Sequence, residues 1–456
     1  MPAIRLPEEA APGAKNYSEQ EGFGTCRRPK MASAPTDASS QRHTYRGGYA
    51  IMAPITRGRL LAVSALALTL ASGTAFAEIT KLRLGVLNDM ASGFSAWSGP
   101  GSVVAAKLAV EDFRKAHPEA KFDIEVLSAD HQNKADVAST IARDWIRDGV
   151  NAIIDVPNSA AALAVAALVK DSDTALLVSG GGHDALTRDA CTPNTVHWTF
   201  DLYSLARNTA QATVETGGKS WFFVTSDYAG GKGLEAVATK FVLEAGGEVK
   251  GHALPPLGLV DYSSFLLQAQ SSGSDVVAFG TAGTDLMNMI KQSNEFGLVE
   301  GGQRLATLAI FINDVHGLGL EVAQGLIYTT AFYWDTNDQT RAFSERFAPA
   351  HDGAMPSEGQ AGVYSVTYHY LESALATGSP KAGTIVANMK AQPIDDPLFG
   401  QVTIRPDGRA IHDMYVMQVK APEESKKPWD YVKALKIIPG DQAFGPAEPN
   451  KCPLAQ

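Results

Sequence analysis

The sequence lacks the short motifs that mark nucleotide, metal and hydrolase sites. After the first apolar run the chain reads GVLNDM over residues 85–90, where a dinucleotide fold would need G-x-G-x-x-G. The GGKG of residues 230–233 has no Ser or Thr after its lysine, so it is not a P-loop. None of the ten histidines stands in H-E-x-x-H, and G-x-S-x-G is absent. These absences argue against nucleotide binding, metalloprotease chemistry and serine hydrolysis.

Cysteine is also scarce, with only Cys26, Cys191 and Cys452 in the chain. These three lie too far apart for a zinc site, so we expect no metal and no cofactor. Asp227 and Asp314 could be imagined as an acid and base pair, but loop carboxylates more often cap helices or face water. We therefore expect a protein that is not an enzyme, with an exported enzyme on an α/β scaffold as an alternative.

Long apolar runs are missing except in residues 52–77. There Arg57 and Arg59 precede an uncharged, mainly apolar run over residues 60–70, and the segment closes on Ala-Phe-Ala at residues 75–77. This order is typical of a secretory signal peptide, and the run is shorter than the roughly 20 residues that cross a bilayer. We predict cleavage after Ala77 and localisation in the periplasm. Because a signal peptide normally starts a chain, we also predict that translation begins at Met52.

The composition before and after this segment supports that division. Residues 1–51 are polar, rich in Pro, Gly and Ser, and without hydrophobic periodicity, so we expect them to be disordered or wrongly included upstream. Residues 78–456 hold 30 basic against 44 acidic residues, a net charge of −14. So acidic a chain is not expected to bind nucleic acid, and it has no polybasic patch for an anionic membrane.

Removal of the leader leaves one pair of cysteines, Cys191 and Cys452, in a compartment that favours disulfides. We predict that they are bridged, which would tie the C-terminal tail to the loop after the fourth strand. Two free buried thiols are the alternative.

Short apolar strands alternate with amphipathic helices along the mature chain. Four apolar strands are predicted at residues 81–89, 122–130, 150–156 and 174–180, each followed by a helical or loop segment. The pattern then restarts at residues 220–228 and ends with an apolar run, ATLAIF, at residues 306–311. Strands of continuous apolar character separated by helices indicate a parallel sheet covered on both faces. The fold class is therefore α/β, with two doubly wound parallel-sheet lobes.

The last part of the chain is predicted to be helical and then to form a hairpin. Helices are expected at residues 340–350, 360–376 and 383–391. The hairpin would pair residues 400–408 with 412–420 through a turn that contains Pro406, Asp407 and Gly408.

A set of short sequences spread over the mature chain resembles the type 1 periplasmic binding proteins of branched-chain amino-acid-type ABC transporters (leucine/isoleucine/valine-binding-protein-like, proteobacterial subgroup). They are GVLNDMASG (85–93), AVEDF (109–113), DYAGG (227–231), YWDTND (333–338), QAGVYS (360–365), RPDGR (405–409) and CPL (452–454).

The resemblance implies a receptor whose two lobes are joined by a three-stranded hinge and close around a ligand. Lobe one would comprise residues 79–203 plus 335–398, lobe two 204–331 plus 399–440, and a C-terminal tail 441–456. Crossings near Tyr203, Phe332 and Phe399 would form the hinge. The implied partners are a small-molecule ligand and an ABC transporter permease, and we expect a monomer. A sensory protein that reports to a membrane kinase has the same fold and is the alternative.

In open parallel sheets the ligand lies at the carboxyl ends of the strands. By position, the resemblance assigns ligand contacts in lobe one to Asn158, Ser159, Gly181, Gly182 and His183. Relatives often have Ala-Thr or Ala-Ser at Gly181-Gly182, so a hydroxyl anchor for a ligand carboxylate is missing here. His183 could supply a donor or be structural.

From lobe two the resemblance adds Tyr228, Thr281, Ala282, Asn313 and Asp314. Asp314 could pair with an ammonium group or cap a helix. Phe94 and Trp97 lie on the first loop, where an aromatic cover would suit an apolar or aromatic ligand. Tyr333 and Trp334 form a second rank, because packing at the hinge accounts for them as well. The predicted ligand is a small organic carboxylate: an amino acid, an amide or an aromatic acid.

Overall fold

The computed structural model describes residues 79–456. The predicted signal peptide, its cleavage site, the start at Met52 and the segment 1–51 lie outside these described residues. The first sheet is parallel and has the strand order β2-β1-β3-β4-β5. Its strands are β1 (Lys81–Asn88), β2 (Asp123–Asp130), β3 (Ala152–Asp155), β4 (Ala175–Val178) and β5 (Thr195–His197).

Helices cover both faces of this sheet because side chains alternate along its strands. Ile154 and Leu177 pack in one hydrophobic cluster with α1 and α11, whereas Ile153 and Leu176 pack in a second with α2 and α3. The helices that cover it are α1 (Gly99–Ala116), α2 (Ala135–Arg147), α3 (Ser159–Val169), α11 (Glu358–Thr377) and α12 (Ala382–Ala391), with α10 (Asp338–Ala350) beside α1.

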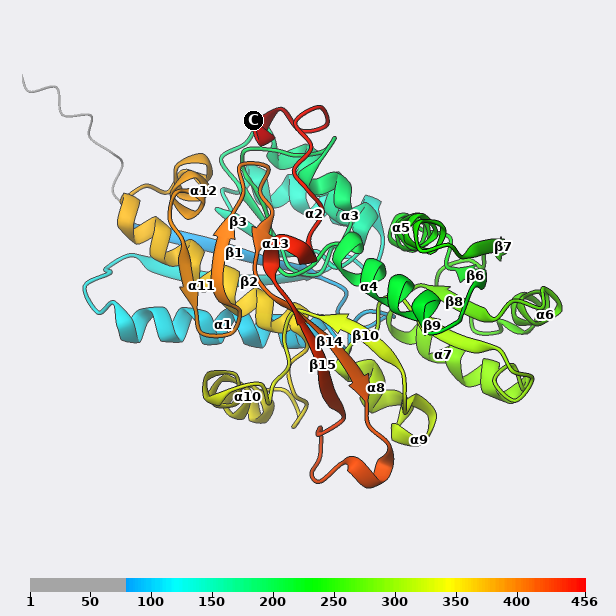
Figure 1. Ribbon diagram of the computed structural model, residues 1–456. Helices are drawn as coiled ribbons and strands as arrows, with labels where there is room; N and C mark the ends of the chain where they lie inside the picture. The colour runs from blue at the N-terminus through cyan, green and yellow to red at the C-terminus, as the bar shows by residue number, and fades with distance from the viewer. Residues whose placement is uncertain (1–78) are drawn as a thin grey trace, which may run out of the picture. The chain divides into compact units, whose positions relative to one another are not determined.

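The second sheet is also parallel, with the order β7-β6-β8-β9. Its strands are β6 (Ser220–Thr225), β7 (Glu248–Ala253), β8 (Val276–Gly280) and β9 (Arg304–Thr307). Its helices are α4 (Leu202–Glu215), α5 (Ala229–Glu244), α6 (Ser263–Ser271), α7 (Gly283–Glu295), α8 (Ile312–Leu318) and α9 (Leu320–Ala323) (Figure 1). The predicted α/β class with two parallel-sheet lobes is confirmed.

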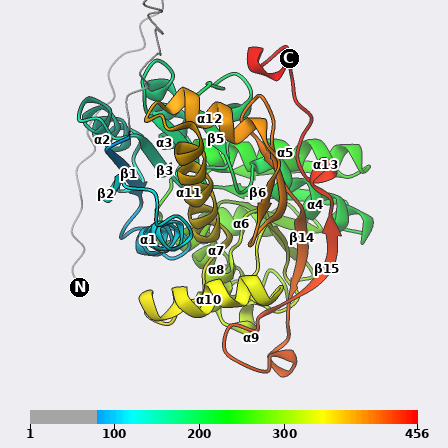
Figure 2. The same ribbon diagram turned by 90° about the vertical axis from the view of Figure 1, so that its left-hand side faces the viewer.

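A third, antiparallel sheet has the order β10-β14-β15. It consists of β10 (Ile327–Thr330), β14 (Met414–Val419) and β15 (Val432–Ile438). The three-stranded hinge expected near Tyr203, Phe332 and Phe399 stays a prediction. Figure 2 shows β14 and β15 side by side as far as the loop that joins them. The short helix α13 (Gly440–Ala443) follows β15.

The predicted terminal hairpin is wrong in its pairing. The strands β11 (Ile394–Asp396), β12 (Gly400–Ile404) and β13 (Ala410–Ile411) form their own antiparallel sheet, and β12 turns into β13 through residues 405–409. The segment expected to pair with β12 instead becomes β14, which pairs with β10 and β15. The chain thus returns to the third sheet after β13. The residue boundaries predicted for the two lobes stay predictions.

The RPDGR turn ties this small sheet to the end of the first sheet. Arg409 is fully buried and donates to the carbonyl of Phe200 at 2.8 Å and to that of Trp198. Its guanidinium lies 4.4 Å from the ring centroid of Phe444. A buried arginine needs such partners, because an unpaired buried charge is strongly destabilising. The turn therefore fixes the segment that leads from β5 into α4.

Candidate ligand-binding cleft

Loops from the carboxyl ends of both parallel sheets meet around one small, partly open cavity of about 20 Å³. The loops of the first sheet contribute Phe94, Trp97, Pro157, Ser159, Gly180 and Gly182. The segment after β5 and the second sheet contribute Phe200, Leu202, Leu205, Tyr228, Leu234, Ala282, Ala309 and Phe311. This is where ligands bind in open α/β sheets.

Aromatic rings from different loops fill the cleft. The rings of Trp97 and Phe311 stack with centroids 4.3 Å apart and planes 25° apart. Phe94 lies 5.5 Å from Trp97 and 6.1 Å from Tyr228, and both Phe94 and Trp97 are 2% exposed. A cavity of this volume holds about one water molecule. A larger solute can enter only if residues that line the cavity move apart.

The loop between β1 and α1 is held in place by its own polar groups. The carboxylate of Asp89 accepts hydrogen bonds from the backbone N–H of Ser92 at 2.9 Å and of Phe94 at 2.8 Å. Ser357, at the start of α11, donates to the carbonyl of Trp97. These bonds position both aromatic side chains before any ligand arrives.

A buried polar cluster stabilises the floor of the cleft. Asp155, at the end of β3, is fully buried and accepts from the amide of Asn88 at 2.6 Å and from the hydroxyl of Ser98 at 2.8 Å. Burial raises the pKa of Asp155 to about 6, although these donors favour its charged form. The cluster joins the start of α1 to β3.

Of the two residues predicted at the start of α3, only Ser159 lines the cavity. Asn158 is the N-cap of α3 and accepts from the N–H groups of Ala160 at 2.9 Å and Ala161 at 3.1 Å. Its amide also donates to Asn133 at 2.7 Å. The side chain of Asn158 is therefore engaged in the fold, as its cap position explains.

The glycines after β4 leave little room for side chains. A Cβ on Gly181 would stand 2.7 Å from the Cβ of Ala162 and from the carbonyl oxygen of Val156. A Cβ on Gly182 would come within 3.0 Å of Leu202 and 3.1 Å of Phe200. The structure places Gly182 on the cavity and Gly181 against α3. Close packing thus explains why a hydroxyl-bearing residue is absent.

His183 lines a separate groove and does not line the cavity. It lines an open groove of about 610 Å³ together with Asp184, Arg188 and Lys232. Its Nδ1 accepts from the N–H of Ala185 at 3.2 Å, which caps the 3-10 helix Asp184–Thr187. Burial lowers the pKa of His183, so it stays neutral at pH 7.

On the side of the second sheet, Tyr228 and Ala282 line the cavity, whereas Thr281, Asn313 and Asp314 do not. Thr281 is fully buried and accepts from the hydroxyl of Ser226 at 2.9 Å. The amide of Asn313 donates to the carbonyl of Met355 at 3.3 Å.

Asp314 is part of the cap of α8. Its carboxylate accepts from the backbone N–H of Phe311 at 3.0 Å, and the residue is fully buried. Burial raises the pKa of Asp314 to about 7. The second-rank residues Tyr333 and Trp334 both donate to the carbonyl of Trp429, at 3.1 Å and 2.9 Å, and pack beside the third sheet.

Sequence reasoning missed most of the apolar lining, notably Phe311, Phe200 and Leu202. The run ATLAIF was expected to be strand throughout, but β9 ends at Thr307 and the rest of the run continues as a loop into the cleft. The aromatic residue at the end of an apolar run was the signal that could have identified Phe311.

Within residues 79–456 no group of three or more His, Cys, Asp or Glu side chains is arranged to hold a metal ion. In the same range no helix is both long enough and apolar enough to cross a membrane.

Three comparisons with known proteins agree with this architecture. The family described as "Periplasmic binding protein" matches residues 81–427. A periplasmic binding protein from Burkholderia mallei is 43% identical, with a TM-score of 0.77, over 80% of this chain and 96% of that one. A branched chain amino acid ABC transporter periplasmic ligand-binding protein from Burkholderia xenovorans LB400 is 37% identical, with a TM-score of 0.69, over 80% and 97%. A Leu/Ile/Val-binding protein homolog 6 from Brucella melitensis is 26% identical over 79% of this chain and 92% of its own length.

Proposed function

The chain belongs to the periplasmic binding protein family, and from this premise we propose that it captures a small organic carboxylate between two lobes and delivers it to the permease of an ABC importer. An amino acid, an amide and an aromatic acid are the candidate ligands. On this proposal the protein is exported by a signal peptide cleaved after Ala77, acts as a monomer and releases its ligand unchanged.

The observation that carries the proposal is the position of the cavity. Its lining comes from loops at the carboxyl ends of two separate parallel sheets, so a ligand bound there touches both. A solute held between two sheets stabilises the state in which their loops meet. A protein that closes around its ligand in this way signals to a partner, through its change in shape, that the ligand is bound.

The third sheet supports a hinge role in this proposal. Its strand β10 follows the helices of the second sheet, whereas β14 follows β13 and the first sheet's helix α12. Rotation about a few residues beside such strands would open the cleft without disturbing either core. The stacked rings of Trp97 and Phe311 would then part and admit the solute.

Uptake by cells tests the importer role. Deletion of the gene should abolish uptake of the bound solute at low external concentration, and restoring the gene should recover it. A sensory protein predicts a different result, in which uptake stays normal and only the transcriptional response to the solute is lost. That second outcome would contradict the proposal.

A further inference from the structure

We infer that the cleft selects solutes with an apolar or aromatic body and a hydrogen-bond-accepting oxygen but without an ammonium group, and that the indole N–H of Trp97 is the donor that recognises them. The inference rests on the proposed function, because it names the class of solute that the same cleft takes. Of the three candidate ligand classes, the inference excludes α-amino acids and retains amides and aromatic acids.

The first observation is that no charged side chain among residues 79–456 lines the cavity, although the carboxylate of Asp155 lies behind the lining residue Gly180. That carboxylate is bonded to Asn88 and Ser98. Aromatic and aliphatic side chains make up most of the cavity wall. Burying an ammonium group without an anionic partner costs far more than burying an apolar group. A solute that carries both a carboxylate and an ammonium group would leave the ammonium without an acidic partner.

Asp314 does not line the cavity in this arrangement. Its carboxylate is fully buried and accepts from the backbone N–H of Phe311 through one oxygen, while the other oxygen has no hydrogen-bond partner among residues 79–456. The raised pKa, about 7, means that the carboxyl is partly protonated at neutral pH. Asp314 therefore acts on α8 rather than on the solute.

The second observation is an unpaired donor on a cavity residue. Among residues 79–456 the Nε1 of Trp97 is buried and has no hydrogen-bond partner, and the side chain is 2% exposed. The opposite edge of the indole, with Cε3 and Cζ3, lies 3.3 Å from where a Cβ on Gly359 of α11 would stand. Nε1 therefore faces away from α11. A buried N–H without a partner is costly, so an accepting oxygen on the solute would be favoured there.

Other groups around the cavity are donors as well. Burial raises the pKa of Tyr228, so its phenol keeps its proton and can donate. The hydroxyl of Ser159 lines the cavity, and α5, a 16-residue helix, begins after Tyr228 without a side-chain cap on its first N–H groups. Unfilled N–H groups at a helix start favour negative charge. Donors in a lining that contains no acidic residue from the described part of the chain match a carboxylate or carbonyl oxygen.

The aromatic walls complete the assignment. Trp97 and Phe311 stack on one another at 4.3 Å, and Phe94 and Phe200 lie 5.5 Å and 5.8 Å from this pair. A flat or apolar solute body that enters between the two stacked rings would replace this contact with a similar one on each side. These new contacts offset the free energy that is lost when the two stacked rings separate.

Two matched pairs of probes test the inference by calorimetric titration of the purified protein. L-phenylalanine and 3-phenylpropanoate differ by the ammonium group alone, and so do L-leucine and 4-methylpentanoate. We expect at least one acid to bind and to bind about 10-fold or more tightly than its amino acid, because an unpaired buried charge is penalised. Tighter binding of either amino acid, or no binding of either acid, would overturn the inference.

Substitutions test the role of Trp97. Trp97→Phe keeps an aromatic ring but removes the N–H, and it should weaken binding of the acid about 10- to 100-fold, the range for a hydrogen bond to a charged group. Trp145→Phe is the matched control, since Trp145 packs against β1 at Gly85, away from the cavity lining. Equal affinity of the Trp97→Phe variant and the control would refute the role of the indole.

Asp314→Asn separates this inference from its main alternative. The variant should bind the acid within about 3-fold of the unchanged protein, because the carboxylate does not face the cavity. Loss of amino-acid binding in this variant would identify Asp314 as an ammonium partner and overturn the inference. The proposed function would survive that result. It would fail only if no solute of any class, amino acids and amides included, bound the protein.

Discussion

At the scale of single residues, the shape of the cleft depends on the direction in which each loop residue points its side chain. Gly181 and Gly182 are neighbours, yet a Cβ on the first would point at α3 and one on the second at Leu202 and Phe200. A side chain at Gly181 would collide with the backbone and with α3. One at Gly182 would require Leu202 and Phe200 to shift by a few tenths of an ångström. The packing of these glycines, rather than the ligand alone, disfavours the hydroxyl that relatives often have there.

Gly181→Ser should therefore destabilise the protein without creating a new ligand contact. Two atoms at 2.7 Å from the added Cβ belong to a helix side chain and to the backbone, which cannot move cheaply. We expect a loss of about 1–3 kcal/mol in the free energy of unfolding, the usual cost of overpacking. Urea unfolding measures it. Gly93→Ala is the control, because nothing lies within 4 Å of its Cβ, and equal losses in both variants would disprove the explanation.

Some of the residues predicted to contact the ligand line the cavity, and others do not. Local hydrogen bonds that a sequence does not reveal make the difference. Phe94, Trp97, Ser159, Gly182, Tyr228 and Ala282 come together around the cavity. Asn158 and Asp314 occupy helix caps instead, and His183 caps a 3-10 helix beside another groove. Capping and ligand binding use the same polar residue types in the same loops, so position along the chain could not separate them.

At the scale of elements, the helices and most strands were predictable because their apolar periodicity is strong. The strand β5 was missed because its three residues are too few to show a period, and β9 was drawn too long because an apolar loop continues it. The pairing of β14 was missed because strand partners distant in the sequence leave no local signal. These failures concern short elements and long-range pairing.

A buried glutamate joins α11 to the end of β10. Glu358 is 2% exposed and accepts from the hydroxyl of Thr330 at 3.0 Å and from the N–H of Ala331. Burial raises the pKa of Glu358 to about 7, and the phenol of Tyr328 lies nearby. The folded protein therefore holds this proton at pH values where the unfolded chain has lost it. The contribution of Glu358 to stability is greatest at low pH and falls as the pH rises from about 4.5 to about 7.

Glu358→Gln should remove this pH dependence. The stability of the unchanged protein, relative to the variant, should fall by about 2–4 kcal/mol between pH 4 and pH 8, since one pKa unit corresponds to about 1.4 kcal/mol. Chemical unfolding of both proteins across that range measures the difference. Glu345→Gln on the exposed side of α10 should show no such trend. A difference for Glu358→Gln that is constant with pH would contradict the assignment.

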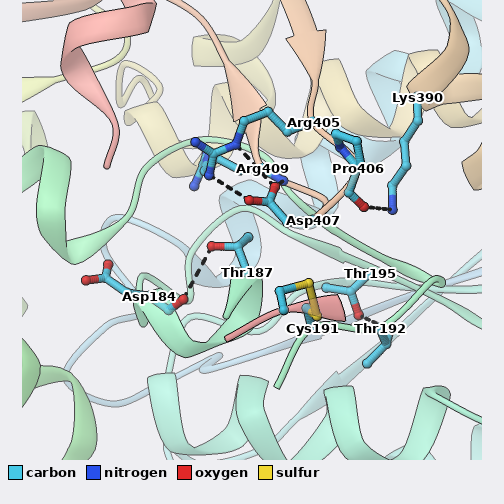
Figure 3. The surroundings of a disulfide bond; sticks show 11 residues. Asp184, Thr187, Cys191, Thr192, Thr195, Lys390, Arg405, Pro406, Asp407 and Arg409 are labelled. Atoms are coloured by element: carbon cyan, nitrogen blue, oxygen red, sulfur yellow. Dashed lines mark hydrogen bonds and ion pairs between the residues drawn. A yellow bond between two sulfur atoms is a disulfide. The ribbon is translucent and has the colours of Figure 1, made fainter. Parts of the chain in front are cut away.

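At the scale of the whole molecule, the C-terminal tail is fastened to the first sheet. Cys191 and Cys452 form the predicted disulfide, with Cα atoms 5.9 Å apart (Figure 3). Ion pairs add to it, with Arg188 and Glu448 at 2.9 Å. Figure 3 also shows the RPDGR turn nearby, where Arg405 pairs with Asp407 at 2.9 Å. The tail holds the loop that follows β4, and the turn holds the segment that follows β5.

Replacing both cysteines by serine should lower the free energy of unfolding by about 3–5 kcal/mol, because the bridge closes a loop of 261 residues in the unfolded chain. Urea unfolding with and without a reductant measures the effect. The reductant should destabilise the unchanged protein and leave the double variant unaffected. Equal stability of the two proteins under oxidising conditions would show that the bridge adds nothing.

The central claim is that one small solute binds between Trp97 and Phe311 and stabilises the folded chain. Thermal unfolding of the protein and of its Trp97→Ala variant, each with a panel of organic acids, amides and amino acids, tests it most directly. At 100 times its Kd a true ligand should add about 2.7 kcal/mol to the unchanged protein, and the variant should lose most of that gain. If no solute stabilised the protein, or if the same solute stabilised both equally, the claim would be contradicted.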